Sequence, residues 1–270
     1  MSTHYSEIEN LLQSAGLLEI KTGVFTFTLD LSFRHERAYA AKLILNVRHP
    51  QCDIDELIIK RIIKKGDRVL DAGAHIGFTA WQMFEAGASS VVAVEPVPSI
   101  YNRLRKLRDS EFHAVNMAID SKSGTRKLIL SASHNQGATL EEAMTAIFPS
   151  VFGFCPENID VTLTTIDELG LRFGDFDVWK LEIEGSETSA LLGGIETMAR
   201  HPPRIIFAEL YDQFRDEFLR LATQTHQYAY RAFIDRNNYG LVLADRDTPS
   251  SEAFFSTSPM FVFSREALER

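Results

Sequence analysis

The sequence predicts an α/β fold: a mainly parallel sheet with helices on both faces, preceded by a small N-terminal α/β extension. From residue 68 onward, short apolar runs alternate with segments of helical periodicity, which is typical of βαβ units. The first apolar run ends in an acid and a glycine-bearing turn, the position where such sheets bind ligands. With 45% hydrophobic residues among 270, the chain can bury a full core.

The N-terminal extension is predicted over residues 1–55. Its residues 3–15 alternate polar and apolar side chains at helical spacing, and residues 24–29 are β-branched or aromatic, as in a strand. The segment 53–64 predicts an amphipathic helix that Asp53 caps and that leads into the main domain.

The main domain is predicted over residues 56–270. Its expected strands are short apolar runs, and they span 68–71, 90–95, 112–119, 175–183, 204–210, 239–243 and 259–263. Its expected helices begin near residue 77, cover 187–198 and run across 212–237. The region 131–160 interrupts this alternation and contains three phenylalanines, which is typical of a lid over a binding site.

Charge and composition restrict the partners. Lys and Arg total 28 against 37 Asp and Glu, a net charge of -9, which argues against a broad nucleic-acid surface. The sequence has no signal peptide and no apolar run of the ~20 residues that a membrane helix needs. Two cysteines are too few for a disulfide framework or a zinc cluster. We therefore expect a cytoplasmic protein that acts on a small molecule, with no nucleic-acid or membrane partner; its oligomeric state is left open, a homodimer included.

The turn after the first apolar run suits a nucleoside cofactor. Asp71 precedes Gly73 and Gly77, which permit a tight turn and close helix packing. His75 stands where a dinucleotide-binding turn has its middle glycine, the residue that lets a pyrophosphate approach the backbone. The turn therefore favours a cofactor that has an ammonium and a carboxylate in place of a pyrophosphate.

Glu95 completes the cofactor hypothesis. It ends the second strand about 20 positions after the turn, where such folds place a carboxylate on the ribose diol. Met117 and Ala118 lie near the end of the third expected strand, where the adenine usually rests in this fold class. The candidate cofactor-binding residues are Asp71, Gly73, Ala74, His75, Gly77, Phe78, Glu95, Pro96, Met117 and Ala118.

With these residues identified, the chain resembles the FkbM family of methyltransferases from about residue 67 to 265. The resemblance rests on an ordered series of segments: 70–77, 94–98, 118–120 with Gly124, 165–167, 180–187 and Glu209. The most specific is 180–187 (KLEIEGSE), which is similar to the family's K-x-D-x-E-G-x-E signature.

The resemblance implies a class I, Rossmann-like fold with a seven-stranded sheet and S-adenosylmethionine as cofactor. It also implies methyl transfer, commonly to a hydroxyl of a sugar or a polyketide-type secondary metabolite. Two residues depart from the family pattern: His75 replaces an asparagine, and Glu182 replaces an aspartate and so extends its carboxylate about one carbon further.

A group of charged residues at strand ends provides the candidates for catalysis. Glu182 and Glu184 are two apart on an expected strand, so their side chains share a face while the strand stays regular. They are candidates for the general base or for ligands of a divalent ion such as Mg²⁺. Lys180 is expected to pair with one of them, and Glu209 either lines the acceptor pocket or caps the next helix. His134, in the insertion, is a further candidate base.

The acidic cluster predicts a neutral acceptor, because an anionic one would meet like-charge repulsion at reduced dielectric. We therefore expect O-methylation of a hydroxyl, with formation of a methyl ester on a carboxylate as the alternative. Two other classes remain open: a nicotinamide-dependent oxidoreductase, which the missing middle glycine disfavours, and a noncatalytic binding protein that keeps the same sheet.

Overall fold

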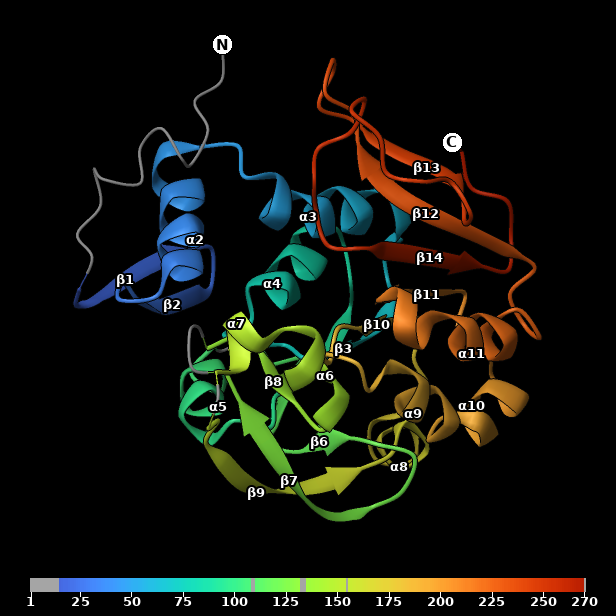
Figure 1. Cartoon of the computed structure of the whole chain (residues 1–270), viewed down its shortest axis with the longest axis horizontal. Helices are drawn as coiled ribbons and strands as arrows, with labels where there is room; N and C mark the ends of the chain where they lie inside the picture. Colours follow the sequence, from blue (N-terminus) through green and yellow to red (C-terminus); the bar gives the residue numbers. More distant parts are fainter. Residues whose placement is uncertain (1–14, 108–109, 132–134, 154, 270) are drawn as a thin grey trace.

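A computed structural model of the chain describes residues 15–107, 110–131, 135–153 and 155–269, which form three sheets and their covering helices (Figure 1). The helix predicted over 3–15 and the candidate base His134 lie outside the described residues. Among the helices that the structure describes, none is long and apolar enough to cross a membrane.

The central sheet has eight strands in the order β13-β12-β14-β11-β10-β3-β4-β5. Five neighbouring strands are parallel: β5 (Phe112–Val115), β4 (Ser90–Val94), β3 (Arg68–Ala72), β10 (Val178–Leu181) and β11 (Ile205–Glu209). Three antiparallel strands extend the β11 edge: β14 (Met260–Ser264), β12 (Tyr228–Ile234) and β13 (Leu241–Asp245). The predicted mainly parallel α/β sheet is confirmed, with eight strands where seven were expected.

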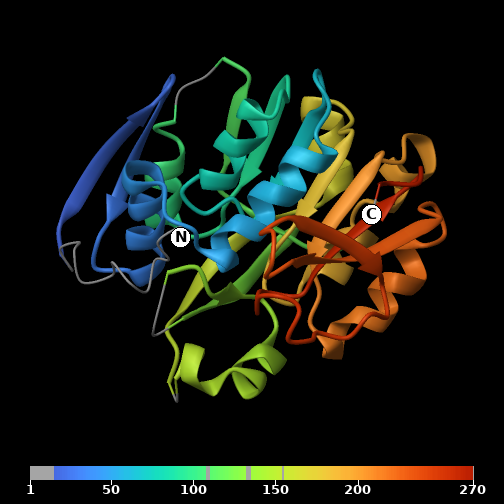
Figure 2. The same cartoon turned by 90° about the horizontal axis from the view of Figure 1, so that it is seen from above.

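Alternate side chains of the parallel strands pack into two separate apolar layers, as the two-residue period of a strand requires. Val69, Val91 and Phe207 face a cluster that includes α3 (Pro50–Ile62), α4 (Phe78–Glu85) and α5 (Pro98–Leu104). The opposite cluster contains Leu70, Val92 and Ile206. It is covered by α8 (Ile166–Phe173), α9 (Glu187–Leu192), α10 (Ile195–Arg200) and α11 (Asp212–Ala222). Figure 2 shows the sheet between these two groups of helices.

The N-terminal segment is joined to the same core. Its hairpin pairs β1 (Leu17–Thr22) with β2 (Phe25–Asp30), and α2 (Arg34–Leu45) follows. Phe27 lies 6.0 Å from the rings of both Phe78 and Trp81 of α4. The predicted cap of α3 was wrong: His49 is the N-cap, and the Asp53 carboxylate instead accepts a bond from His49 N at 2.8 Å.

Three other predicted elements differ from the structure. The strand expected over 112–119 is divided into β5 and β6 (Ala118–Ile119), and β6 joins a second sheet with β9 (Asn158–Thr164), β7 (Gly124–Leu130) and β8 (Ala138–Thr139). The helix expected over 187–198 is broken at Gly193, where a Cβ would lie 2.3 Å from the Asp120 carbonyl oxygen. The helix expected over 212–237 ends at Ala222, because the tyrosine-rich segment after it pairs as β12.

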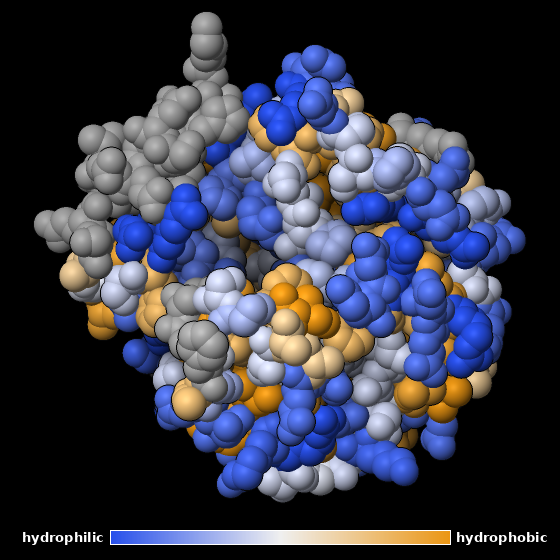
Figure 3. Space-filling model, in the orientation of Figure 1, coloured by the Kyte–Doolittle hydropathy of each residue, from blue (hydrophilic) through white to orange (hydrophobic). Residues whose placement is uncertain are grey.

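The expected insertion contains two short helices, α6 (Glu142–Ile147) and α7 (Pro149–Phe152). In Figure 3 an apolar patch lies over this segment, beside a hollow in the middle of the same face. Met144 and Phe152 are buried, and Phe148 and Phe214 pack against them. The insertion is therefore fixed to the rest of the molecule by an apolar cluster of its own.

Candidate functional site

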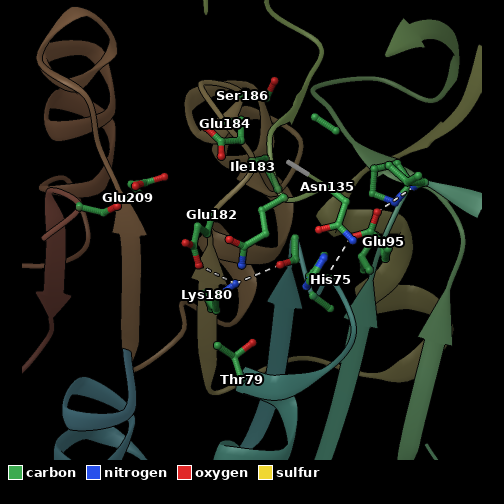
Figure 4. Close-up of a pocket in the computed structure, with 18 of the residues that line it drawn as sticks. His75, Thr79, Glu95, Asn135, Lys180, Glu182, Ile183, Glu184, Ser186 and Glu209 are labelled. Atoms are coloured by element: carbon green, nitrogen blue, oxygen red, sulfur yellow. Dashed lines mark hydrogen bonds and ion pairs between the residues drawn. The ribbon is translucent and has the colours of Figure 1, made fainter. Parts of the chain in front are cut away.

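A cavity of about 380 Å³ opens at the carboxyl ends of the parallel strands. Glu95 follows β4, Glu182 follows β10 and Glu209 ends β11, and all three line the cavity (Figure 4). This is the edge where open α/β sheets bind their ligands, and the volume is within the range of small-molecule sites.

The turn between β3 and α4 depends on its two predicted glycines. Gly73 has φ +77°, and a Cβ there would lie 1.9 Å from the Glu182 carbonyl oxygen. Gly77 is the N-cap of α4 at φ +85°, and a Cβ there would lie 2.3 Å from Leu107 Cδ1. Gly73 therefore brings the turn directly against the backbone after β10. Gly77, in contrast, is needed for packing and does not line the cavity.

Glu95 links this turn to the loop after β4. Its Oε2 accepts a hydrogen bond from His75 N at 3.0 Å, and its Oε1 accepts one from Val97 N at 2.8 Å. Burial raises the pKa of Glu95 to about 7, although both hydrogen bonds favour the ionised form. A carboxylate has about four acceptor positions, so capacity remains for a ligand. The ribose contact stays a prediction.

Part of the cavity wall is apolar. Met117, Ala118, Ile119 and Leu128 line it, and Phe152 of the insertion is also part of the wall. The predicted residues Ala74, His75, Phe78 and Pro96 line the cavity as well.

Lys180 is a buried cation held between two carboxylates. Its Nζ lies 3.0 Å from Asp71 Oδ1 and 3.1 Å from Glu182 Oε2, and its side chain is 1% exposed. Burial alone would lower the pKa of Lys180, but Asp71, Glu182 and Asp55 raise it above its ordinary value. Asp71 also accepts a bond from Thr79 Oγ1 at 2.9 Å and does not line the cavity. The expected pairing of Lys180 is present, and Asp71 lies beneath the site rather than in its wall.

The segment after β10 is a turn rather than a continuing strand. The strand ends at Leu181, and Glu184 has φ +55°, so Glu182 and Glu184 do not share a strand face as expected. Both still line the cavity. The Glu187 carboxylate fixes the turn by accepting bonds from Ile183 N at 2.8 Å and Gly185 N at 3.1 Å.

Two further acids of the cavity have raised pKa values. Burial raises the pKa of Glu184 well above its usual range, and Glu209 and Glu182 add to the effect. Burial and the charge of Glu182 raise the pKa of Glu209 to about 7, although Ser258 and Tyr211 donate hydrogen bonds to it. Glu209 therefore titrates near neutral pH. Its buried side chain lines the cavity, and the α11 N-cap is Tyr211, with no side-chain cap bond. A contact between Glu209 and the acceptor stays a prediction.

The sequence analysis missed the wall contributed by α2 and α3. His35 and Tyr39 of α2 and Cys52 and Asp55 of α3 line the cavity. The sequence does indicate that Asp55 faces the interior. It lies at helical spacing from Cys52 and Ile59, on the otherwise apolar face of the predicted helix.

One group of potential metal ligands lies close together in the described part of the chain. Among the described residues, His35, Glu36 and His75 have ligand atoms within 4.8 Å of one another, whereas Glu182 and Glu184 belong to no such group of three. The Glu36 carboxylate is already paired with Arg103 at 2.7 and 2.9 Å. Glu36 is therefore already engaged in an ion pair, and the use of a metal by Glu182 and Glu184 stays a prediction.

Known proteins were then compared with the chain. The model of the methyltransferase FkbM domain matches residues 71–239. Of the solved structures, a methyltransferase FkbM from Methylobacillus flagellatus KT is 14% identical at a TM-score of 0.49, over 86% of this chain and 52% of that chain. A SAM-dependent methyltransferase from Agrobacterium tumefaciens is 11% identical at a TM-score of 0.46, over 93% and 71% of the two chains. This chain thus spans about half the length of the first of these proteins. No curated protein sequence matches it significantly. Because the family model covers more than half of the chain, the protein belongs to the FkbM methyltransferase family.

Proposed function

We propose that this protein transfers a methyl group from S-adenosylmethionine to a hydroxyl of a neutral small molecule, such as a sugar or a polyketide-type metabolite. The observation that carries the proposal is that one cavity contains both a part suited to the nucleoside of the cofactor and a cluster of carboxyl groups. We assign Glu95 and Met117, which follow β4 and β5, to the first half, and Glu182, Glu184 and Glu209, at the ends of β10 and β11, to the second.

The residues of the first half fit the cofactor chemically. Glu95 offers acceptor capacity for a ribose diol, and the backbone of Gly73 lies open to the cavity without a side chain. Met117, Ala118 and Leu128 offer an apolar surface for a flat adenine ring. When bound, the cofactor supplies an already activated methyl group, so the protein has to position the acceptor and remove its proton.

The residues of the second half support that role. Positioning of the acceptor can contribute roughly 7–11 kcal/mol to lowering the barrier. The proton of the acceptor hydroxyl must pass to a general base, and the carboxyl groups that line this half are the candidates. Lys180 holds Glu182 in place through their ion pair. A route through Mg²⁺ would need Glu182 and Glu184 as ligands, and treatment with a chelator tests it.

The charge of the cavity supports a neutral acceptor. Asp55, Glu182, Glu184 and Glu209 line it, and Lys180 is the cation among them. A carboxylate acceptor would meet like charges at reduced dielectric, where a close pair costs several kcal/mol. A hydroxyl meets no such repulsion and can donate its hydrogen to these groups.

The experiment uses methyl-labelled S-adenosylmethionine and fractions of an extract from the source organism. The product of each accepting fraction is identified by mass spectrometry. Two matched acceptors then compete: one presents a hydroxyl, and the other presents a carboxylate at the same position. A methyl ether as the dominant product supports the proposal. A methyl ester, or labelling of no fraction, refutes it.

A further inference from the structure

Asp55 of α3 lies in the wall of the cavity, although it belongs to the segment before the part of the chain that the family model matches. It lines the cavity together with Lys180, Glu182 and Glu209. The N-terminal segment therefore contributes a carboxyl group to the acceptor half of the site.

One oxygen of this carboxyl group, Oδ1, is buried and has no hydrogen-bond partner within the part of the chain that the structure describes. Glu182 is paired with Lys180, and Glu209 accepts bonds from Ser258 and Tyr211. A buried oxygen without a partner is unfavourable for folding, so Asp55 needs an explanation outside the stability of the fold.

Other residues hold α3 in position. Gln51 Nε2 donates to Ser258 Oγ at 2.5 Å, and Ser258 N donates to Gln51 Oε1 at 2.9 Å. Asp53 accepts a bond from the Tyr239 hydroxyl at 2.6 Å and forms an ion pair with Lys42. The position of Asp55 is therefore fixed without a contribution from its own Oδ1.

We propose that Asp55 is a catalytic residue that accepts the proton of the acceptor hydroxyl, so that the N-terminal segment completes the active site. The inference rests on the proposed O-methylation. In that reaction the hydroxyl oxygen bonds to the methyl carbon, the carbon–sulfur bond breaks with its electron pair left on sulfur, and the hydroxyl proton passes to the Asp55 carboxylate.

The surroundings of Asp55 set the pH at which it can act. Titratable groups from five elements interact electrostatically with Asp55. They are Lys180 on β10, Glu182 after β10, Glu209 on β11, Asp71 on β3, Tyr39 on α2 and Cys52 on α3. Burial raises the pKa of Asp55 well above its usual range; Glu182, Glu209 and Asp71 act in the same direction and Lys180 opposes them. Since a base must be ionised, transfer by this route increases as the pH rises through that raised pKa.

The variant Asp55→Asn removes the base but keeps the size of the side chain. Asp216→Asn serves as a matched control, because the Asp216 side chain is 94% exposed. We expect calorimetry to give the same affinity of all three proteins for S-adenosylmethionine within twofold. Turnover on the accepting extract fraction should fall at least ~10²-fold in Asp55→Asn alone.

Stability supplies a readout that does not depend on activity. When the pKa of a carboxyl group is higher in the folded protein than in the unfolded chain, where it is near 4, the free energy of unfolding depends on pH. It falls as the pH rises from the pKa of the unfolded chain through the pKa of the folded protein. Asp55→Asn lacks this loss, so at pH 8 it should melt at or above the temperature of the wild type. A purely structural role for Asp55 predicts the opposite order.

The possible results are distinguishable. If the wild type forms a methyl ether and Asp55→Asn forms it equally well, the inference fails while the proposed function stands. A tenfold loss of affinity for S-adenosylmethionine would assign Asp55 to the cofactor instead, and a lowered melting temperature at pH 8 would assign it to the fold. If the wild type forms no ether, the proposed function itself fails.

Discussion

Replacing Gly73 with alanine tests how closely the cofactor turn approaches the segment after β10. The added Cβ would lie 1.9 Å from the Glu182 carbonyl oxygen, which is backbone and cannot rotate away. The left-handed conformation costs roughly 1–2 kcal/mol for a residue with a Cβ, and overpacking adds roughly 1–3 kcal/mol. Together these predict a loss of about 2–5 kcal/mol.

Gly66→Ala is the matched control. Gly66 has φ +95°, and a Cβ there meets nothing within 4 Å among the described residues, so this variant measures the conformational cost alone. At roughly 2–4 °C per kcal/mol for a domain of this size, Gly73→Ala should melt several degrees below Gly66→Ala. It should also bind S-adenosylmethionine more weakly, because the turn is displaced. Equal melting temperatures in differential scanning calorimetry would refute the close approach.

Four further predictions concern the carboxyl groups and the use of a metal. Glu95→Ala should raise the dissociation constant of S-adenosylmethionine at least tenfold in calorimetry, since each charge-assisted bond is worth about 1.5–3 kcal/mol; unchanged affinity would remove the ribose assignment. Glu182→Gln should lower turnover ~10²-fold or more with little change in cofactor affinity. A chelator should leave the wild type active, whereas a loss that Mg²⁺ restores would favour a metal. Burial raises the pKa of Glu187 to about 8, above its unfolded value near 4.3, so stability should fall as the pH rises from about 4.5 to 8. In Glu187→Gln the melting temperature should fall less over this pH range than in the wild type. An equal fall in both proteins would show that Glu187 does not have the raised pKa.

The turn after β3 could be predicted because its residues are local. Gly73 and Glu95, which line the cavity, lie within one βαβ unit, where strand ends and turn residues follow directly from the sequence pattern. Even there, the pattern did not indicate that Asp71 is buried beneath the cavity with Lys180.

The part of the cavity that α3 and the segments after β10 and β11 form was harder to predict because these segments are distant in sequence. Gln51 and Ser258 are 207 positions apart in the sequence and are joined by hydrogen bonds. No local sequence pattern indicates this contact. The turn at Glu184 was missed because it depends on the Glu187 carboxylate, which holds two backbone N–H groups of that turn. The division of the strand expected over 112–119 is likewise a tertiary effect, since β6 pairs with β9, a strand from a later part of the chain.

The bonds between Gln51 and Ser258 also have a consequence for the order of folding. The turn after β3 lies beside β4, which is close in sequence, and it also meets the backbone after β10, at Glu182. The wall that α3 adds to the cavity requires α3 to meet the segment just before β14, across 207 positions of sequence. Such non-local closure is slow compared with local pairing. A chain emerging from the ribosome can therefore pair β3 with β4 early, whereas the bonds that hold α3 at the cavity form only after the segment around Ser258 has been made.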